Sequence, residues 1–368
     1  MLAAVAIAVL AVTAPSAVAA KPIAGHYIVQ VAGGKDPAAV ARSHNASPRF
    51  VYRAALNGFA VELTDKQRAA LQRNPNVTLI EQDQEVTLSA TQTMAVGGGL
   101  WGLDRIDQRA LPLSGTYTYN SVAATVTSYV IDTGLLAEHS DFGGRARNVY
   151  NSAGGKSTDC NGHGTHVGGT IGGATYGVAK ATQLRGVKVL GCSGSGSYSG
   201  IIAGVDWVKA NAVKPAIANL SLGGGANSSL NTAVTNLANS GVFVAVAAGN
   251  ESTDACTTSP ASAPAVYTVA ASDKTDTHAS FSNLGSCVDG YAPGVGITSA
   301  WKNGGTNTIS GTSMASPHVA GVAALYKGTN GDASQATVES WINTNATNGA
   351  LRSVPSGTVN RLLFKDTL

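Results

Sequence analysis

The alternation of short apolar segments with helix-like segments is the feature that most constrains the fold of this chain. Five runs rich in Val, Ile and Ala have the length of buried strands: 125–131, 184–189, 217–221, 242–247 and 266–270. Helical segments lie between them, for example 199–210 and 229–240. Strands that alternate with helices form a parallel sheet with both faces covered. We therefore predict an α/β domain built on a mainly parallel, twisted sheet.

Residues 21–89 have a different pattern. Predicted strands and helices follow one another as β-α-β-β-α-β, with segments at 26–31, 37–44, 49–63 (two strands around Asn57-Gly58), 64–73 and 77–88. The second helix begins with Thr64 three residues before Gln67, which is a helix-capping pattern. This order is typical of a small split-βαβ, ferredoxin-like α+β domain.

Residues 1–20 are almost entirely apolar or small and end in Ala-Val-Ala-Ala. This composition predicts a signal peptide with small residues at its cleavage site. A transmembrane anchor is the alternative, but Pro15 interrupts the apolar run and the flanking residues do not fit an anchor. We expect a secreted protein with no membrane attachment after processing.

Composition excludes several classes of protein. The chain has 368 residues, 44 of them Gly, and only 12% are charged, which fits a tightly packed α/β protein rather than a disordered chain or a coiled coil. The net charge of +3 is small and is not gathered in runs, so it gives no argument for a nucleic-acid partner.

A candidate nucleophile lies in the segment NTISGTSMASPHV, residues 307–319. Small residues there form a turn that places Ser313 at the start of an apolar helix, where we expect its side chain to be exposed. The helix N-terminus offers backbone N–H groups and a positive dipole end to a developing oxyanion. His318 lies farther round the helix, and we expect it to serve in packing.

A serine nucleophile needs a base and a group that orients the base. Asp132 ends a predicted strand, and functional groups gather at the carboxyl ends of parallel strands. His163 lies between glycines in NGHGTH, residues 161–166. His163 and His166 could instead form a metal pair, but the Glu of the H-E-x-x-H pattern is absent. The order acid, base, nucleophile is one of the three known orders of a Ser-His-Asp triad.

Six motifs together resemble the subtilisin-like serine proteases. They are WGLDRIDQ (101–108), VIDTG (130–134), NGHGTHV (161–167), SLGGG (221–225), AAGN (247–250) and GTSMASPH (311–318). Within this family the chain is most similar to the proteinase K branch, and there to aqualysin-type secreted bacterial enzymes. The resemblance spans almost all of residues 90–368.

The resemblance implies a division of the chain. Residues 1–20 are expected to be a signal peptide, 21–89 an inhibitor-like propeptide that assists folding, and 90–368 a peptidase domain with the three-layer subtilisin-like fold. The propeptide tail would pass through the active site and be cut near residues 89–90. The protein's partners would then be protein and peptide substrates and its own propeptide, and the enzyme would be a monomer.

The resemblance also implies roles for further residues. Asn250 would join the backbone N–H of Ser313 in the oxyanion hole. Two glycine-rich stretches would flank an extended substrate: Gly194, Ser195 and Gly196 on one side, and Ser221, Leu222 and Gly223 on the other. Glycine-rich edges leave backbone groups free to pair with a peptide, so we expect broad specificity.

Four cysteines fit an exported protein, and their spacing alone allows three pairings. The resemblance implies Cys160–Cys192 and Cys256–Cys287. It also implies structural Ca²⁺ held by the carbonyls of Pro264 and Val266 and the carboxylate of Asp289, because hard oxygen ligands suit this ion. A second calcium site is expected at Asp104, Asp107 and Gln108, although some ligands expected just downstream are replaced. No catalytic metal is expected.

We therefore predict a secreted serine endopeptidase that is made as a zymogen and works through an acyl-enzyme. An α/β-hydrolase would need G-x-S-x-G and another residue order, and here Ala315 replaces the second glycine. A catalytically inactive peptide-binding protein on the same fold is the remaining alternative. Such a protein would normally have lost a triad member or Asn250, and the sequence retains all four.

Overall fold

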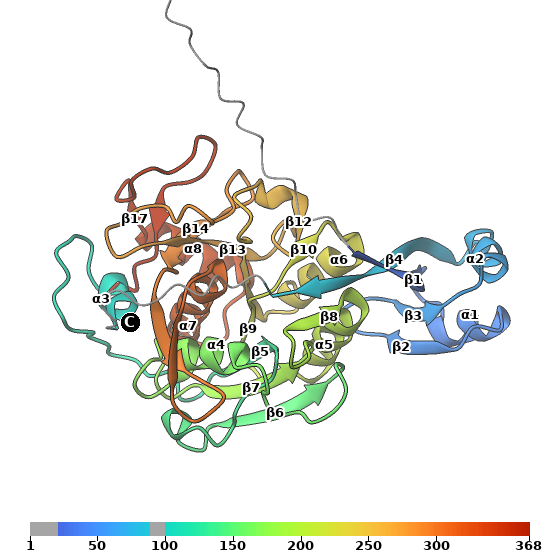
Figure 1. Ribbon diagram of the computed structural model, residues 1–368, viewed down its shortest axis with the longest axis horizontal. Helices are drawn as coiled ribbons and strands as arrows, with labels where there is room; N and C mark the ends of the chain where they lie inside the picture. Colours follow the sequence, from blue (N-terminus) through green and yellow to red (C-terminus); the bar gives the residue numbers. More distant parts are fainter. Residues whose placement is uncertain (1–20, 89–99) are drawn as a thin grey trace, which may run out of the picture.

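The computed structural model describes residues 21–88 and 100–368 (Figure 1). A small N-terminal domain, residues 21–88, lies at one end of a larger C-terminal domain, residues 100–368. The expected signal peptide and the expected processing point at 89–90 lie outside the described residues.

The N-terminal domain has the predicted element order. It consists of β1 (Lys21–Val31), α1 (Pro37–Ser43), β2 (Pro48–Tyr52), β3 (Gly58–Glu62), α2 (Asp65–Gln72) and β4 (Val77–Thr87). Its strands pair antiparallel in the order β2-β3-β1-β4. The capping box predicted at the start of α2 is present, since Thr64 and Gln67 bond to each other's backbone N–H groups.

The C-terminal domain is built on a nine-stranded sheet within residues 100–368. Its order is β17 (Thr347–Asn348), β18 (Arg361–Leu362), β14 (Gly290–Pro293), β13 (Tyr267–Ser272), β11 (Phe243–Ala247), β9 (Ala216–Leu220), β5 (Thr127–Asp132), β7 (Gln183–Lys188) and β6 (Ala146–Asn151). Every neighbouring pair is parallel except β17 and β18. The predicted mainly parallel sheet is therefore confirmed.

Helices cover both faces of this sheet (Figure 1). Helices α4 (His163–Gly172) and α7 (Thr312–Asn330) share one hydrophobic cluster, and α5 (Tyr198–Asn211) and α6 (Ser228–Ala238) share another. The remaining elements are α3 (Trp101–Ile106), η1 (Ser140–Phe142), β8 (Ser195–Ser197), β10 (Gly224–Gly225), η2 (Ala255–Thr257), β12 (Thr258–Ser259), β15 (Ile297–Ala300), β16 (Thr306–Ile309) and α8 (Gln335–Asn345).

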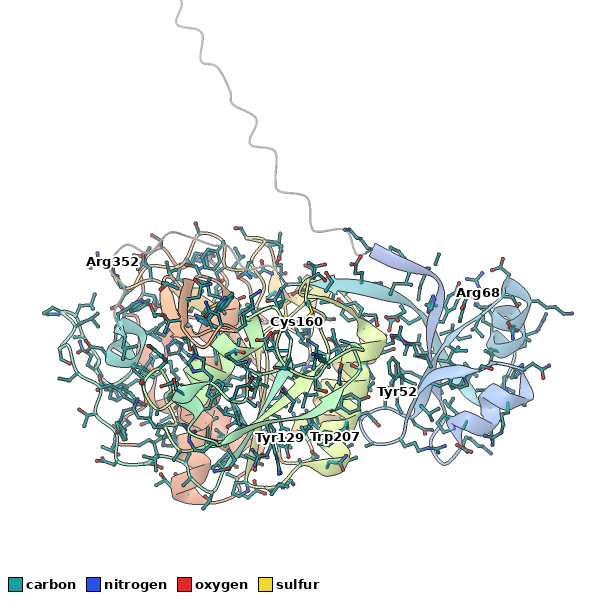
Figure 2. The ribbon with its side chains drawn as sticks, turned by 60° about the horizontal axis from the view of Figure 1, so that its bottom comes forward. Tyr52, Arg68, Tyr129, Cys160, Trp207 and Arg352 are labelled. Carbon is teal, nitrogen blue, oxygen red and sulfur yellow. A yellow bond between two sulfur atoms is a disulfide. The ribbon has the colours of Figure 1, made fainter. Side chains whose placement is uncertain are left out.

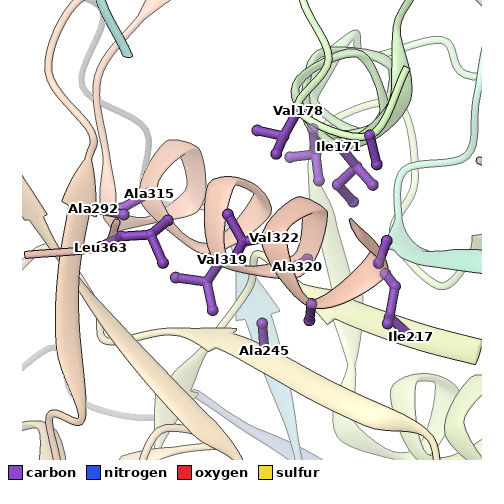
Figure 3. Close-up of a cluster of buried hydrophobic side chains, with 14 of the residues drawn as sticks. Ile171, Val178, Ile217, Ala245, Ala292, Ala315, Val319, Ala320, Val322 and Leu363 are labelled. Atoms are coloured by element: carbon purple, nitrogen blue, oxygen red, sulfur yellow. The ribbon is translucent and has the colours of Figure 1, made fainter. Parts of the chain in front are cut away.

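Helix α7 runs through the centre of the larger core. Figure 3 shows Val319, Ala320 and Val322 of this helix among side chains from α4 and from the sheet. These side chains are fully buried, so the helix is apolar around most of its circumference, as a core helix must be. The core therefore fixes the start of α7, which carries Ser313.

The N-terminal domain packs on α5 and α6 of the C-terminal domain. Tyr52, labelled in Figure 2 where the two domains meet, donates a hydrogen bond to the backbone oxygen of Ser199 at 3.0 Å. Asp206 of α5 accepts hydrogen bonds from the consecutive backbone N–H groups of residues 53–56, at 2.6–3.4 Å. Polar contacts thus fix the orientation of an interface that is otherwise apolar.

Two acids on β4 cap helices of the other domain. Asp83 is buried and accepts from the backbone N–H of Ser199 at 3.0 Å, in the first turn of α5. Glu81 accepts from the backbone N–H groups of Ser228 and Ser229, each at 3.0 Å, at the start of α6. A carboxylate stabilises the positive end of a helix dipole and satisfies N–H groups that have no partner within the helix.

We expect Asp83→Ala to destabilise the whole chain by about 1–2 kcal/mol, because it leaves the buried N–H group of Ser199 unpaired at the start of α5. The measurement is the denaturant midpoint of the full chain carrying Ser313→Ala, which removes the predicted nucleophile. Glu62→Ala is the matched control, since this exposed acid of the same domain ends a strand and lies in no helix. Equal midpoints for the two variants would contradict the capping role.

Candidate active site

The structure brings the three predicted catalytic residues together at the carboxyl edge of the sheet. Asp132 is the last residue of β5, His163 is the first residue of α4, and Ser313 lies in the first turn of α7. All three are buried. Helix α4 begins at His163 itself, so this side chain belongs to the first turn of the helix.

Asp132 and His163 form a close pair. The Nδ1 atom of His163 lies 2.9 Å from each carboxylate oxygen of Asp132, whose Oδ1 also accepts from the backbone N–H of Thr133 at 2.7 Å. An Nδ1–H donor leaves the other ring nitrogen as a lone-pair acceptor. That atom, Nε2, is buried and has no hydrogen-bond partner among the described residues. The imidazole is thus oriented as a base.

Two glycines allow this approach. Gly162 has a φ of +111°, and a β-carbon there would lie 2.5 Å from the ring of Trp301. A β-carbon at Gly164 would lie 2.2 Å from the backbone oxygen of Gly134, just beyond the end of β5. Any larger residue at Gly164 would therefore separate His163 from Asp132.

Ser313 is 4% exposed, so the expectation of an exposed side chain is wrong in this structure. Its Oγ donates to the backbone oxygen of Ser221 at 3.1 Å, and the Oγ of Ser221 donates to the backbone oxygen of Ser313 at 2.8 Å. The start of α7 is thereby tied to the segment after β9. Packing of the neighbouring segments against this turn explains the low exposure.

Asn250 lies beside Ser313. Its Oδ1 accepts from the backbone N–H and the Oγ of Thr312 at 2.8 and 2.9 Å, which fixes the direction of the side-chain amide. A β-carbon built at Gly311 would lie 3.6 Å from both Nδ2 of Asn250 and the backbone N of Ser313. These two donors therefore border the same small space, as an oxyanion hole requires.

The end of the N-terminal domain lies in the predicted substrate cleft. Strand β4 pairs antiparallel with β8, with Val86 opposite Gly196 and Thr87 opposite Ser195. The backbone N–H of Leu88 donates to the oxygen of Gly194 at 3.0 Å. A cavity of about 410 Å³ is bordered by Leu88, by Ser221, Leu222 and Gly223, and by Asn250 and Ser313. Both predicted edges of the cleft thus face the tail.

Comparison with known proteins agrees with this geometry. Residues 125–362 match the Subtilase family, and residues 26–89 match the Peptidase inhibitor I9 family. The chain belongs to the subtilase family. An extracellular serine proteinase of Thermus sp. (strain Rt41A) is 58% identical over 280 residues, which cover 75% of this chain and 67% of the relative.

Two further proteins are similar to this subtilase over most of its length. Alkaline serine exoprotease A of Vibrio alginolyticus is 51% identical over 327 residues, and the match covers 86% of this chain and 60% of that protein. The crystal structure of a cold-adapted subtilisin-like serine proteinase aligns with a TM-score of 0.71 at 52% identity, covering 72% of this chain and 97% of that one. Family membership makes the subtilase a serine endopeptidase with an N-terminal inhibitor domain.

The two other histidines near the candidate site of this subtilase face backbone oxygens. Nε2 of His166 lies 3.0 Å from the oxygen of Ile297, and Nδ1 of His318 lies 2.8 Å from that of Met314. Burial lowers the pKa of His166 to about 3 and that of His318 to about 4, so both are neutral. His318 is buried as predicted, and the rings of His166 and His163 have different partners, Ile297 and Asp132.

Both disulfides implied by the resemblance are present in the described residues, as Cys160–Cys192 and Cys256–Cys287. The first lies at the active site, because Asn161, two residues before His163, donates from its side chain to the oxygen of Cys192 at 3.1 Å. The Cys160–Cys192 disulfide therefore stabilises the loop that leads into α4.

Residues that the sequence did not single out also hold the site. Thr312 orients Asn250, and the buried charged residues Asp159 and Lys188 contact the loops on either side of His163 and Asp132. The sequence contains a weak signal for two of them: Asp159 is an acid four residues before His163, and Lys188 is a lysine at the end of an apolar strand.

The two predicted calcium sites differ. Desolvation raises the pKa of the half-buried Asp289 to about 7. A hydrogen bond from the backbone N–H of Thr268 at 2.7 Å has the opposite, smaller effect on this pKa. Asp104 and Gln108 instead accept hydrogen bonds from the loop that follows them: Ser114 donates from its backbone to both side chains, at 3.0 and 2.9 Å. Asp107 accepts from the backbone N–H of Thr118 at 2.6 Å.

Within residues 21–88 and 100–368, no three His, Cys, Asp or Glu side chains gather as a metal-binding group would. The same part of the chain contains no helix that is both long and apolar enough to cross a bilayer.

Proposed function

We propose that this subtilase is a secreted bacterial endopeptidase of broad specificity that is made as a zymogen and matures by cutting itself. The observation that carries the proposal is the position of the chain's own tail, which ends as a strand on β8 and borders the same cavity as Ser313 and Asn250. A peptide held there lies as a substrate would.

In the proposed reaction, Oγ of Ser313 attacks the carbonyl carbon of a peptide bond while His163 takes the hydroxyl proton at Nε2. His163 then returns this proton to the leaving amine, and an acyl-enzyme remains. A water molecule attacks the ester by the same route and frees the serine. Asp132 keeps the imidazole in the required tautomer and stabilises its charged form.

The oxyanion of each tetrahedral intermediate would accept from the backbone N–H of Ser313 and from Nδ2 of Asn250. Thr312 positions that amide before any charge develops, so the site is preorganised. In the state described, the Ser313 hydroxyl donates to the oxygen of Ser221. Attack requires that this hydroxyl turn from Ser221 toward Nε2 of His163.

Substrate recognition would rely on the main chain. The edge formed by Gly194, Ser195 and Gly196 pairs with β4 through backbone groups, and such pairing does not depend on the side chains of the peptide. The stretch Ser221, Leu222 and Gly223 would form the opposite edge. Broad specificity follows from this mode of binding.

We propose the same division of the chain as the sequence predicted: a signal peptide over 1–20, an inhibitory propeptide over 21–89 and a monomeric peptidase domain over 90–368. The caps that Glu81 and Asp83 place on α6 and α5 support a role of the propeptide in folding as well as in inhibition.

We propose one structural Ca²⁺ site, at Asp289 with the backbone oxygens of Pro264 and Val266. The donor set fits, since it combines a carboxylate with neutral oxygens, and a cation there would offset the desolvation of Asp289. When bound, the ion would supply stability and no chemistry. The second site, at Asp104, Asp107 and Gln108, stays a prediction; these side chains also accept hydrogen bonds from the loop that follows them.

We expect the purified full chain to be cut near residues 89–90, and the Ser313→Ala chain to remain intact. Intact mass and N-terminal mapping of both proteins, expressed side by side, provide the measurement. Identical cutting of both would assign the cleavage to a host protease. A folded wild-type chain that stays uncut and hydrolyses no peptide would indicate an inactive peptide-binding protein.

We expect Asn250→Ala to lower kcat by about 10²–10³-fold with little change in KM, as loss of the equivalent donor does in subtilisin itself. Steady-state hydrolysis of a peptide substrate by the mature enzyme gives both constants. Asn330→Ala, at the exposed far end of α7, is the matched control and should leave kcat unchanged. An unchanged kcat in Asn250→Ala would exclude the oxyanion role.

We expect a calcium chelator to lower the thermal midpoint of the Ser313→Ala chain by about 5–10 °C, because the folded state loses a bound ligand. Asp289→Asn should unfold at the lower temperature with or without chelator. The exposed Glu138→Gln should respond as the parent chain does. A midpoint that the chelator does not move would refute the calcium site.

A further inference from the structure

Two buried charged residues beside the triad have no part in the reaction described above. Asp159 is 4% exposed and lies in the loop before α4, and Lys188 is 1% exposed and ends β7. Lys188 is opposite Asp132 in the pairing of β5 with β7. Charged side chains are rarely buried without a specific function or partner.

Asp159 binds the start of the helix that carries His163. Its Oδ1 accepts from the backbone N–H groups of Asn161 and Gly162 at 2.9 and 2.8 Å. Its Oδ2 accepts from the backbone N–H and the Oγ1 of Thr165 at 2.9 and 2.6 Å. One carboxylate thus fixes the backbone on both sides of His163.

Lys188 binds the residue that follows the catalytic acid. Its Nζ donates to the backbone oxygen of Thr133 at 2.6 Å and lies 3.8 Å from Sγ of Cys160. Burial lowers the pKa of Lys188, and the carboxylates of Asp159 and Asp132 oppose this effect. Two nearby carboxylates thus favour the charged form of a lysine that burial disfavours.

Thr133 connects the two charges. Its Oγ1 donates to Asp159 at 2.9 Å and accepts from the backbone N–H of Gly164 at 2.9 Å, while its backbone oxygen accepts from Lys188. Its backbone N–H donates to Asp132. A single residue thus joins the end of β5, the start of α4 and the end of β7.

The charges of this cluster are complementary to the charge that forms during the reaction. With neutral His163, the carboxylates of Asp132 and Asp159 outnumber the ammonium of Lys188 by one charge. When His163 takes the serine proton, the cluster becomes neutral. The other titratable groups facing it are His166 of α4, which is neutral, and the exposed Lys302 of the β15–β16 hairpin, whose Nζ donates to the oxygen of Cys160 at 3.1 Å.

We propose that Asp159 and Lys188 are positioning residues of the catalytic triad, which together fix the geometry of His163 against Asp132 and set the charge that surrounds the imidazole. The proposal rests on the proposed function, because it assigns His163 the role of the base. A purely structural role, as a helix cap and a strand anchor, is the alternative that the test must separate.

The test is the pH profile of kcat/KM, whose acid limb follows the ionisation of His163 in the free enzyme. Activity requires neutral imidazole, so it is full above the pKa of His163 and is lost below it. Lys188→Met removes a cation, which raises this pKa, and the limb should move up by about 0.5 pH unit. Asp159→Asn removes an anion, which lowers the pKa, and the limb should move down by about the same amount.

Both variants should also lose about tenfold in kcat/KM at the optimum, because the pair no longer holds its geometry. Lys188→Arg keeps the charge and should keep the limb within about 0.2 pH unit of wild type. Lys302→Met is the matched control, because this exposed lysine of the β15–β16 hairpin also contacts Cys160, and solvent screening should leave its limb in place.

Opposite movement of the two limbs supports the proposal. Limbs that stay at the wild-type position, or move in the same direction, would overturn it and leave only the structural role. Asp159→Asn is nearly isosteric and carries the test alone if Lys188→Met does not fold; its limb must then move down.

A second measurement separates this proposal from the proposed function. The Hε1 resonance of His163 in the full chain carrying Ser313→Ala gives the pKa of the imidazole by NMR without turnover. The same substitutions should shift this pKa in the same opposite directions. Absence of Ser313-dependent hydrolysis would refute the proposed function, whereas absence of the opposite shifts would refute the positioning role.

Discussion

The close approach of the first turn of α4 to the end of β5 is the contact on which the rest of the site depends. It exists because Gly164 has no side chain to meet the oxygen of Gly134. Once the two segments touch, Thr133 can bond to both, and His163 falls within hydrogen-bond distance of Asp132. The sheet supplies the position of β5, and the packed helix α7 brings Ser313 to the same edge.

Much of this arrangement could be predicted from the sequence, because it follows from patterns along the chain. The alternation of apolar strands with helices gave the parallel sheet, and a parallel sheet collects the carboxyl ends of its strands at one edge. Asp132 ends such a strand, and Ser313 begins a helix. The capping pattern of Thr64 and Gln67 likewise predicted the start of α2, since both partners lie within one helical turn.

What escaped prediction depends on contacts between distant segments. Thr312 and Asn250 are 62 residues apart, and nothing local shows that one orients the other. Lys188 is buried against the usual tendency of lysine, and only the tertiary structure shows the oxygen and the carboxylates around it. The hydrogen bond from Ser313 to the oxygen of Ser221 depends on the side-chain rotamer of Ser313, which cannot be read from the sequence.

The helix caps on α5 and α6 have a consequence for the lifetime of the protein. The acids that complete these helices belong to β4, in the domain that our proposal removes. Under that proposal, a chain without this domain would keep the folded helices and lose the two carboxylates that cap them. If such a chain unfolded, it would have to refold without these caps, so its persistence would depend on the height of the unfolding barrier rather than on an equilibrium. The two carboxylates of β4 would thus be present while the enzyme folds and absent while it works, so its lifetime would depend on slow unfolding and not on refolding.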